Sequence, residues 1–135
     1  MNQRSSLRRK DLLYPDLSYK IVGCAFDVHN SLGGGHHEKH YQRGLAEAFS
    51  HQGLVFQQQI GFPLHFKGKV IGKNVLDFLV EKKVVVEIKK GERFSKAHID
   101  QVVSYLKSSK VPLALLINFA SQGVMFRRIV NLKNS

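Results

Sequence analysis

The spacing of apolar residues predicts three amphipathic helices. Apolar side chains recur every three to four positions over residues 15–32, 36–52 and 95–109, which places them on one face of each helix. Pro15 supplies a start signal for the first helix, and a run of three glycines that begins at Gly33 ends it. Gly53 ends the second helix in the same way. These segments are expected to pack their apolar faces on a common core.

Shorter runs of aliphatic, β-branched and aromatic residues predict strands between and after these helices. A charged break, Glu81 to Lys83, separates two of the runs and predicts a β-hairpin. Residues 67–69 predict another turn. The order of helices and strands predicts a one-domain α/β sandwich. The expected strands cover residues 54–60 and 62–66, joined around Gly61, then 76–80, 84–88, 112–119 and 124–130.

The central hairpin brings three charged residues together. With a three-residue loop, Asp77 lies directly opposite Glu87, and Lys89 follows on the same face because side chains alternate along a strand. Opposed residues have Cβ atoms about 5 Å apart, and two carboxylates at that distance repel by roughly 3 kcal/mol at an effective dielectric of about 20. Either a divalent cation lies between them, with Mg²⁺ suited to such hard oxygen ligands, or Lys89 neutralises part of the charge in a structural ion cluster at the sheet edge.

The overall charge changes the set of expected partners. The chain has 135 residues, with 21 Lys and Arg against 10 Asp and Glu, giving a net charge of +11. Such an excess favours a polyanionic partner, most often nucleic acid. Residues 1–14 are expected to form a basic flexible arm, and residues 15–135 a single domain.

The chain contains no run long enough to span a membrane and no apolar stretch after the basic N-terminus of the kind that a secretory signal requires. We therefore expect a cytoplasmic protein, with an organelle transit peptide as the alternative. Cys24 is the single cysteine and falls on an apolar helical stretch, so we expect a reduced core residue.

Other candidate sites are weaker. Three histidines surround Glu38, but the spacing does not fit the zinc-protease pattern, and we expect His36, His37 and His40 to face solvent. Gln101 and Tyr105 lie four residues apart and so share one side of the third helix. This pair can have a functional role only if that helix packs beside the carboxylate end of the hairpin.

Taken together, these residues resemble the GxxExxY family of the PD-(D/E)xK nuclease superfamily over about residues 17–131. The resemblance implies a restriction-endonuclease-like α/β core, in which a central mixed sheet is flanked by helices. It rests on five elements in order: Gly35-x-x-Glu38-x-x-Tyr41, then Asp77, then Glu87-Ile88-Lys89, then Gln101-x-x-x-Tyr105, and Leu116-Ile117-Asn118-Phe119.

The resemblance also implies roles for individual residues. Asp77 and Glu87 would hold Mg²⁺ or Mn²⁺, with the Ile88 carbonyl and Glu38 as further metal contacts. Lys89 would activate water or stabilise the phosphate, and Gln101 would border the catalytic site. The residues expected to contact nucleic acid, with DNA favoured over RNA, are Lys89, Lys90, Arg93, Gln101 and Tyr105.

The chain also departs from the family pattern. Val75 stands where an arginine is expected, Ala120 stands where a glycine is expected, and the cluster of histidines is unusual. Three functions remain in competition at this point. They are a metal-dependent nuclease, a non-catalytic nucleic-acid-binding or accessory protein with the same fold, and a protein-interaction role such as formation of a homodimer.

Overall fold

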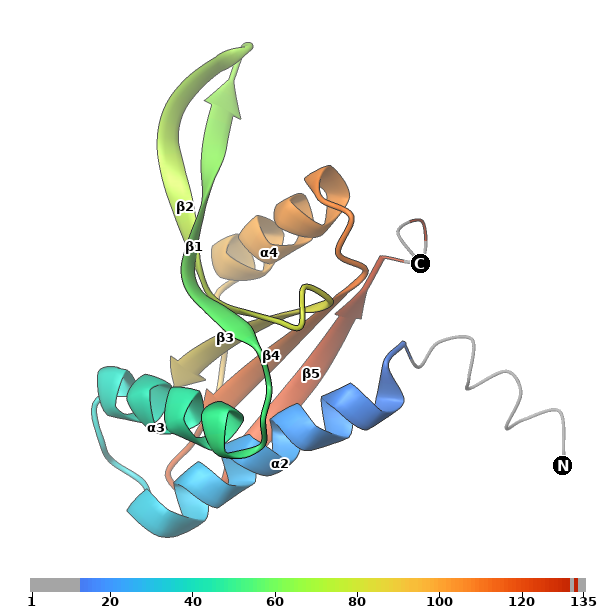
Figure 1. Cartoon of the computed structure of the whole chain (residues 1–135). Helices are drawn as coiled ribbons and strands as arrows, with labels where there is room; N and C mark the ends of the chain where they lie inside the picture. Colours follow the sequence, from blue (N-terminus) through green and yellow to red (C-terminus); the bar gives the residue numbers. More distant parts are fainter. Residues whose placement is uncertain (1–12, 132, 134–135) are drawn as a thin grey trace, which may run out of the picture.

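The computed structural model describes residues 13–131 and 133 of the chain. One mixed sheet of five strands runs through it in the order β1-β2-β3-β4-β5. All pairs are antiparallel except β3 with β4, which are parallel and connected through α4. Figure 1 shows the elements, which are α2 (Pro15–Leu32), α3 (Glu38–His51), β1 (Phe56–Phe66), β2 (Lys69–Val80), β3 (Val84–Lys90), α4 (Lys96–Ser108), β4 (Leu113–Phe119) and β5 (Val124–Val130).

Two apolar clusters hold helices on opposite faces of the sheet. Alternate residues of β3 and β4 serve the two clusters, as the period of two requires. Val86 and Ile88 pack with α2 and α3, whereas Val85 packs with Val102 and Leu106 of α4. The fold is therefore an α/β layer structure with a restriction-endonuclease-like arrangement, as the sequence predicted.

The hairpin of β1 and β2 extends well beyond the rest of the sheet (Figure 1). β2 pairs with β3 only from Phe78 to Val80, while β1 and β2 pair over nearly their whole length. The outer part is therefore a two-stranded ribbon, here called the hairpin arm (residues 61–76), which packs against the α4 cluster near its base through Phe62 and Leu76 and is exposed toward its tip. Phe66, Val70 and Ile71 are exposed on it.

Several predicted boundaries are corrected by the structure. The two strands expected on either side of Gly61 are one continuous strand, in which Gly61 pairs with Val75 and the alkyl stem of Lys73 covers it. The second helix begins at Glu38 and not at residue 36, because His37 is extended and serves as its N-cap. β2 reaches back to Lys69, beyond the expected start at residue 76.

The described residues at the N-terminal end, Leu13 and Tyr14, pack against the larger apolar cluster. Residues 1–12 of the predicted arm lie outside the described part. Cys24 is buried and free, as expected. Among the described residues no helix is both long and apolar enough to cross a membrane.

Candidate functional site

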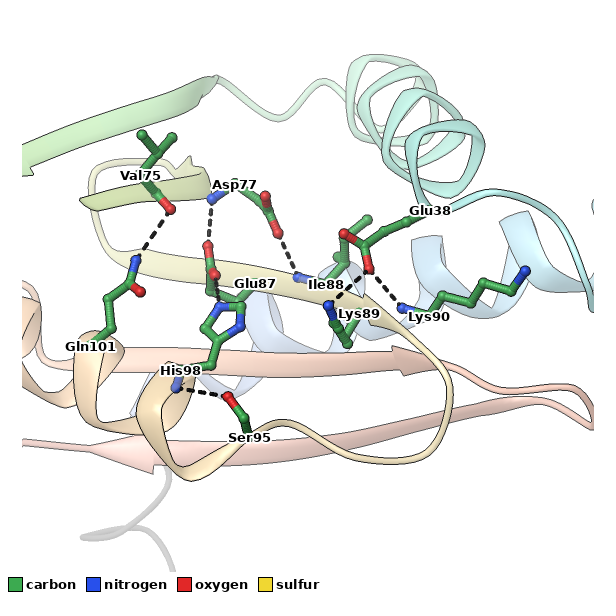
Figure 2. Close-up of polar contacts among 10 residues, drawn as sticks. All are labelled: Glu38, Val75, Asp77, Glu87, Ile88, Lys89, Lys90, Ser95, His98 and Gln101. Atoms are coloured by element: carbon green, nitrogen blue, oxygen red, sulfur yellow. Dashed lines mark hydrogen bonds and ion pairs between the residues drawn. The ribbon is translucent and has the colours of Figure 1, made fainter. Parts of the chain in front are cut away.

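β2 and β3 separate where their carboxylates face each other. Regular pairing ends at Phe78 opposite Val86, which is the predicted register. Beyond it, the Asp77 backbone N–H donates to Glu87 Oε1 at 2.5 Å, and the Ile88 N–H donates to Asp77 Oδ2 at 2.8 Å (Figure 2). Each carboxylate thus satisfies a backbone donor that faces the other strand. The two side chains thus bridge the strands beyond the end of regular pairing, and these hydrogen bonds fix their positions.

Glu87 has a second partner that the sequence did not suggest. The carboxylate is buried, and its Oε2 pairs with Nε2 of His98 in the first turn of α4. Ser95 caps this turn by accepting from the His98 N–H at 3.1 Å. The hydrogen bond to Glu87 raises the pKa of His98, against the opposing effect of burial. The sequence carried one indication that His98 faces the same way as Gln101 and Tyr105, since residues 98, 101 and 105 follow the helical spacing that places them on one face.

Asp77 is the most strongly perturbed acid of the site. Burial raises the pKa of Asp77 to about 7, and repulsion from Glu87 adds to this rise. The hydrogen bond from the Ile88 N–H opposes it. A carboxylate with such a pKa is destabilised by its own charge and favours a positive partner.

Glu38 reaches the same edge from the start of α3. Its Oε1 accepts from the Lys90 N–H at 2.9 Å, across 52 positions of the sequence. The same oxygen lies 4.0 Å from Nζ of Lys89, and both side chains are about half exposed. Because exposed pairs at this distance contribute little to stability, Lys89 can engage another anion at low cost. Figure 2 shows Glu38 of α3 and Asp77 of β2 beside the stretch of β3 that carries Glu87 and Lys89.

The remaining residues expected at the site lie around this edge. Gln101 borders it, and its Nε2 donates to the Val75 carbonyl at 3.5 Å. Tyr105 is half-buried and packs its ring against Phe62, with centroids 5.1 Å apart. Arg93 is exposed on the link between β3 and α4, on the side toward β5.

The histidines near Glu38 form a cluster of their own. Nε2 of His36 donates to the Leu32 carbonyl at 2.7 Å, and the His36 ring meets the ring of His40 edge to face. His37 and His40 are exposed, as expected, whereas His36 is half-buried. Within the described ranges, no group of three or more His, Cys, Asp or Glu side chains has the geometry to hold a metal ion.

The donors at the opened edge fit a divalent cation in chemistry. Asp77 and Glu87 supply hard carboxylate oxygens, which suit Mg²⁺ with water in its remaining positions. The Ile88 N–H faces Asp77, so the backbone of this residue borders the same opening. Both oxygens of Glu87 already have protein partners, so any cation would share this carboxylate with His98 or displace it.

A mixed sheet with helices on both faces and an acidic pair at an opened strand edge defines the restriction-endonuclease-like class of fold. The sequence profile of the PD-(D/E)XK nuclease superfamily matches residues 15–129. The chain belongs to this superfamily. No curated protein matches the sequence.

Among solved structures, the crystal structure of SSO0001 is similar to this chain. The two share 20% sequence identity with a TM-score of 0.47, over 67% of this chain and 48% of the other. The chain thus spans about half the length of that protein.

Proposed function

We propose that the protein is a divalent-metal-dependent nuclease that hydrolyses phosphodiester bonds at the edge between β2 and β3. The observation that carries this proposal is the crossed pair of hydrogen bonds by which Asp77 and Glu87 replace strand pairing. That arrangement keeps two carboxyl groups side by side, although burial and the repulsion from Glu87 raise the pKa of Asp77 and so destabilise its charged form. Membership of a nuclease superfamily supports the same conclusion.

Each residue at this edge has its own role in the proposed reaction. Asp77 and Glu87 would hold Mg²⁺ or Mn²⁺, with the Ile88 carbonyl and Glu38 beside them. A bound cation would supply positive charge that polarises the phosphodiester and lowers the pKa of water. Lys89 orients the attacking water or steadies the phosphate, and Gln101 lies at the border of the site, where it fixes the strand edge through Val75.

A closer assignment to the GxxExxY family is part of this proposal. Its support is local geometry at the start of α3. Tyr41 is buried and donates through its hydroxyl to the Gly33 carbonyl at 2.7 Å, while the same oxygen accepts from the His36 N–H. This tie fixes the turn before α3, and α3 in turn presents Glu38 to Lys90.

Nucleic acid is the proposed substrate, with DNA favoured over RNA. The net charge of +11 favours a polyanion. Lys89 and Lys90 are exposed at the end of β3 and Arg93 is exposed on the link that follows it, and all three are proposed to contact the phosphate backbone.

Cleavage assays test the proposal. Plasmid DNA, single-stranded DNA and RNA are incubated with Mg²⁺ or Mn²⁺ and the wild type, Asp77→Asn or Lys89→Ala. Cleavage by the wild type should be lost in both variants. Glu47→Gln and Lys110→Ala change an exposed acid and an exposed base elsewhere and should cleave normally. Activity that survives Asp77→Asn would show a contaminant or a different site, and would overturn the proposal.

The alternative is a nucleic-acid-binding protein without turnover. One observation favours it, which is that both oxygens of Glu87 are already hydrogen-bonded within the protein. This alternative predicts no cleavage with either metal, together with binding whose affinity falls steeply with salt because phosphate contacts release counterions.

A further inference from the structure

A concave surface lies next to the candidate active edge, where Asn118 of β4 pairs with Lys89 of β3. It has a volume of about 320 Å³, at the lower end of the range for small-molecule pockets. It opens between the link that follows β3 and the strands β4 and β5. The pocket is lined by Glu92, Arg93, Phe94, Asn118, Met125, Phe126 and Arg127.

Asn118 is the unusual member of this lining. The residue is 7% exposed, and its side-chain Nδ2 has no hydrogen-bond partner among the described residues. Buried polar groups in native proteins are almost always paired, so an unpaired amide at a pocket requires an explanation. An acceptor on a bound molecule would satisfy it.

The position of Asn118 connects this pocket to the active edge. Asn118 pairs with Lys89 in the parallel ladder of β3 and β4, so their backbones are about 4.8 Å apart, the spacing of neighbouring strands. Phe94 is a second connection between the two places. It lines the pocket, and its ring lies edge to face with the ring of His98, which pairs with Glu87.

The charge and the apolar surface of the pocket suit a nucleotide. Arg93 and Arg127 are exposed cations, against one acid, Glu92. Met125 is 45% exposed and half-buried Phe94 adds an aromatic ring, whereas Phe126 pairs with Ile117 and therefore projects from the other face of the sheet. Cations for phosphates and aromatic faces for bases form the combination that binds single-stranded nucleic acid.

We infer that this pocket binds one unpaired base of a single-stranded nucleic acid, the nucleotide that neighbours the phosphate held at the Asp77 and Glu87 edge. The base packs against Phe94 and Met125 and accepts a hydrogen bond from the Asn118 amide, while Arg127 and Arg93 contact its phosphates. An unpaired base is required because the edges of a paired, stacked base do not reach into such a pocket. The inference rests on the proposed function for the location of the scissile phosphate, but not for the binding itself.

The test measures binding without cleavage. Fluorescence anisotropy in EDTA follows a short labelled oligothymidylate and an oligouridylate, and the tighter of the two serves as the probe. Asn118→Leu keeps the side-chain size and removes the amide, and Arg127→Gln removes one exposed cation. Both should weaken binding by about tenfold or more. Arg43→Gln removes an exposed cation from α3 and should weaken it far less.

Thermal melting separates a binding role from a structural one. Since Asn118→Leu removes an unpaired buried donor, its melting temperature should be unchanged or raised. If Asn118→Leu fails to fold, Arg127→Gln and Met125→Ala decide the matter, because both positions are exposed. Equal affinities of these variants and the wild type would overturn the inference, as would tighter binding of a fully base-paired hairpin than of the single strand.

Cleavage assays keep this inference distinct from the nuclease proposal. If the wild type cleaves, Asp77→Asn does not, and Asn118→Leu cleaves with unchanged KM and affinity, the pocket is refuted and the nuclease stands. If the wild type cleaves nothing but Asn118→Leu and Arg127→Gln bind weakly, the pocket stands and the nuclease fails. An abasic oligonucleotide should bind the wild type as weakly as the normal strand binds Asn118→Leu.

Discussion

At the scale of single residues, the acidic pair at the strand edge combines two opposed demands. In the proposed nuclease, Asp77 and Glu87 would have to stay close enough to share a cation, yet burial removes both from water and their charges repel. The protein meets both demands by giving each carboxylate a backbone N–H from the opposite strand. These hydrogen bonds restrain the geometry but leave Asp77 with a pKa of about 7.

This pKa predicts how stability depends on pH. The folded-state pKa of Asp77 lies above its ordinary value of 3.8. The stability that the folded state gains by holding Asp77 protonated is therefore fully present below about pH 4 and is lost as the pH rises through 7. In metal-free buffer the free energy of unfolding should fall by on the order of 2–4 kcal/mol between pH 4 and pH 8 through this group. Asp77→Asn keeps an oxygen acceptor for the Ile88 N–H and should show a smaller fall.

Urea unfolding at both ends of this pH range, in EDTA, measures the difference. Glu47→Gln serves as the control, because this acid is exposed on α3 and its removal should leave the wild-type pH dependence. Identical pH dependence in Asp77→Asn and the wild type would contradict the assigned cause.

The raised pKa of His98 leads to a second prediction, in which stability again falls as the pH rises. Its pKa is raised by the hydrogen bond to Glu87, so its stabilising contribution is present below the ordinary pKa of 6.5 and is lost as the pH rises through the raised value. His98→Ala also leaves a buried carboxylate oxygen without its donor. It should lower the free energy of unfolding by about 1–3 kcal/mol near pH 6, and by less at pH 9. His51→Ala, at an exposed position on α3, should show no such pH dependence.

The sequence predicted that the two acids face each other but did not predict the contact of His98 with Glu87. Alternation along the strands was enough to place Asp77 opposite Glu87 and Lys89 beyond them. A single histidine on a helix carries no comparable pattern, because its meaning depends on which strand the helix covers. The unpaired amide of Asn118 is equally invisible in sequence, since pairing is a property of the packed interior.

At the scale of elements, the sequence succeeded where the strands are buried and failed where they are exposed. The register of the central hairpin follows from its apolar runs and the length of its loop. The turn itself carries little information, because Glu81 and Lys82 both adopt positive φ without the Asn-Gly pair typical of such turns. Gly61 predicts a break because glycine usually interrupts strands, whereas here it makes room for the stem of Lys73.

The hairpin arm is the element with the clearest electrostatic character. No acidic residue occurs from residue 48 to residue 76, and Lys67, Lys69 and Lys73 are all exposed on the arm. A two-stranded ribbon of this kind is narrow enough to enter the major groove of a duplex or to follow its backbone. Since β2 also carries Asp77, the arm extends from the candidate active edge itself.

Neutralising these lysines tests the arm. Changing all three to glutamine should weaken DNA binding and lower the slope of log affinity against log salt by about 0.9 for each duplex phosphate that the protein no longer neutralises. The matched control changes three exposed lysines elsewhere, Lys20, Lys107 and Lys110, to glutamine and so removes the same net charge. If both triple variants reduce the slope equally, the arm has no special role and only the total charge matters.

At the scale of the whole molecule, the site exists only in the folded chain. Glu38 reaches Lys90 from the start of α3, Asp77 lies on β2, and His98 lies on the helix that connects β3 to β4. An unfolded chain would leave these groups far apart in space and freely solvated. A cation that needs the assembled site therefore binds the native state and adds its binding free energy to the stability of the entire fold.

This linkage separates a metal site from a structural ion cluster without any assay of activity. At a hundredfold excess of Mg²⁺ or Mn²⁺ over its Kd, the wild type should gain about 2.7 kcal/mol, which raises the melting temperature by several degrees. The metal should relieve the loss of stability at high pH as well, because its positive charge offsets the burial and the repulsion from Glu87 that together raise the pKa of Asp77. Asp77→Asn should gain little, and Ca²⁺ and NaCl at equal ionic strength control for screening and for metal specificity. A wild type that melts at the same temperature with and without either metal would show that the two carboxylates serve only to hold β2 and β3 together.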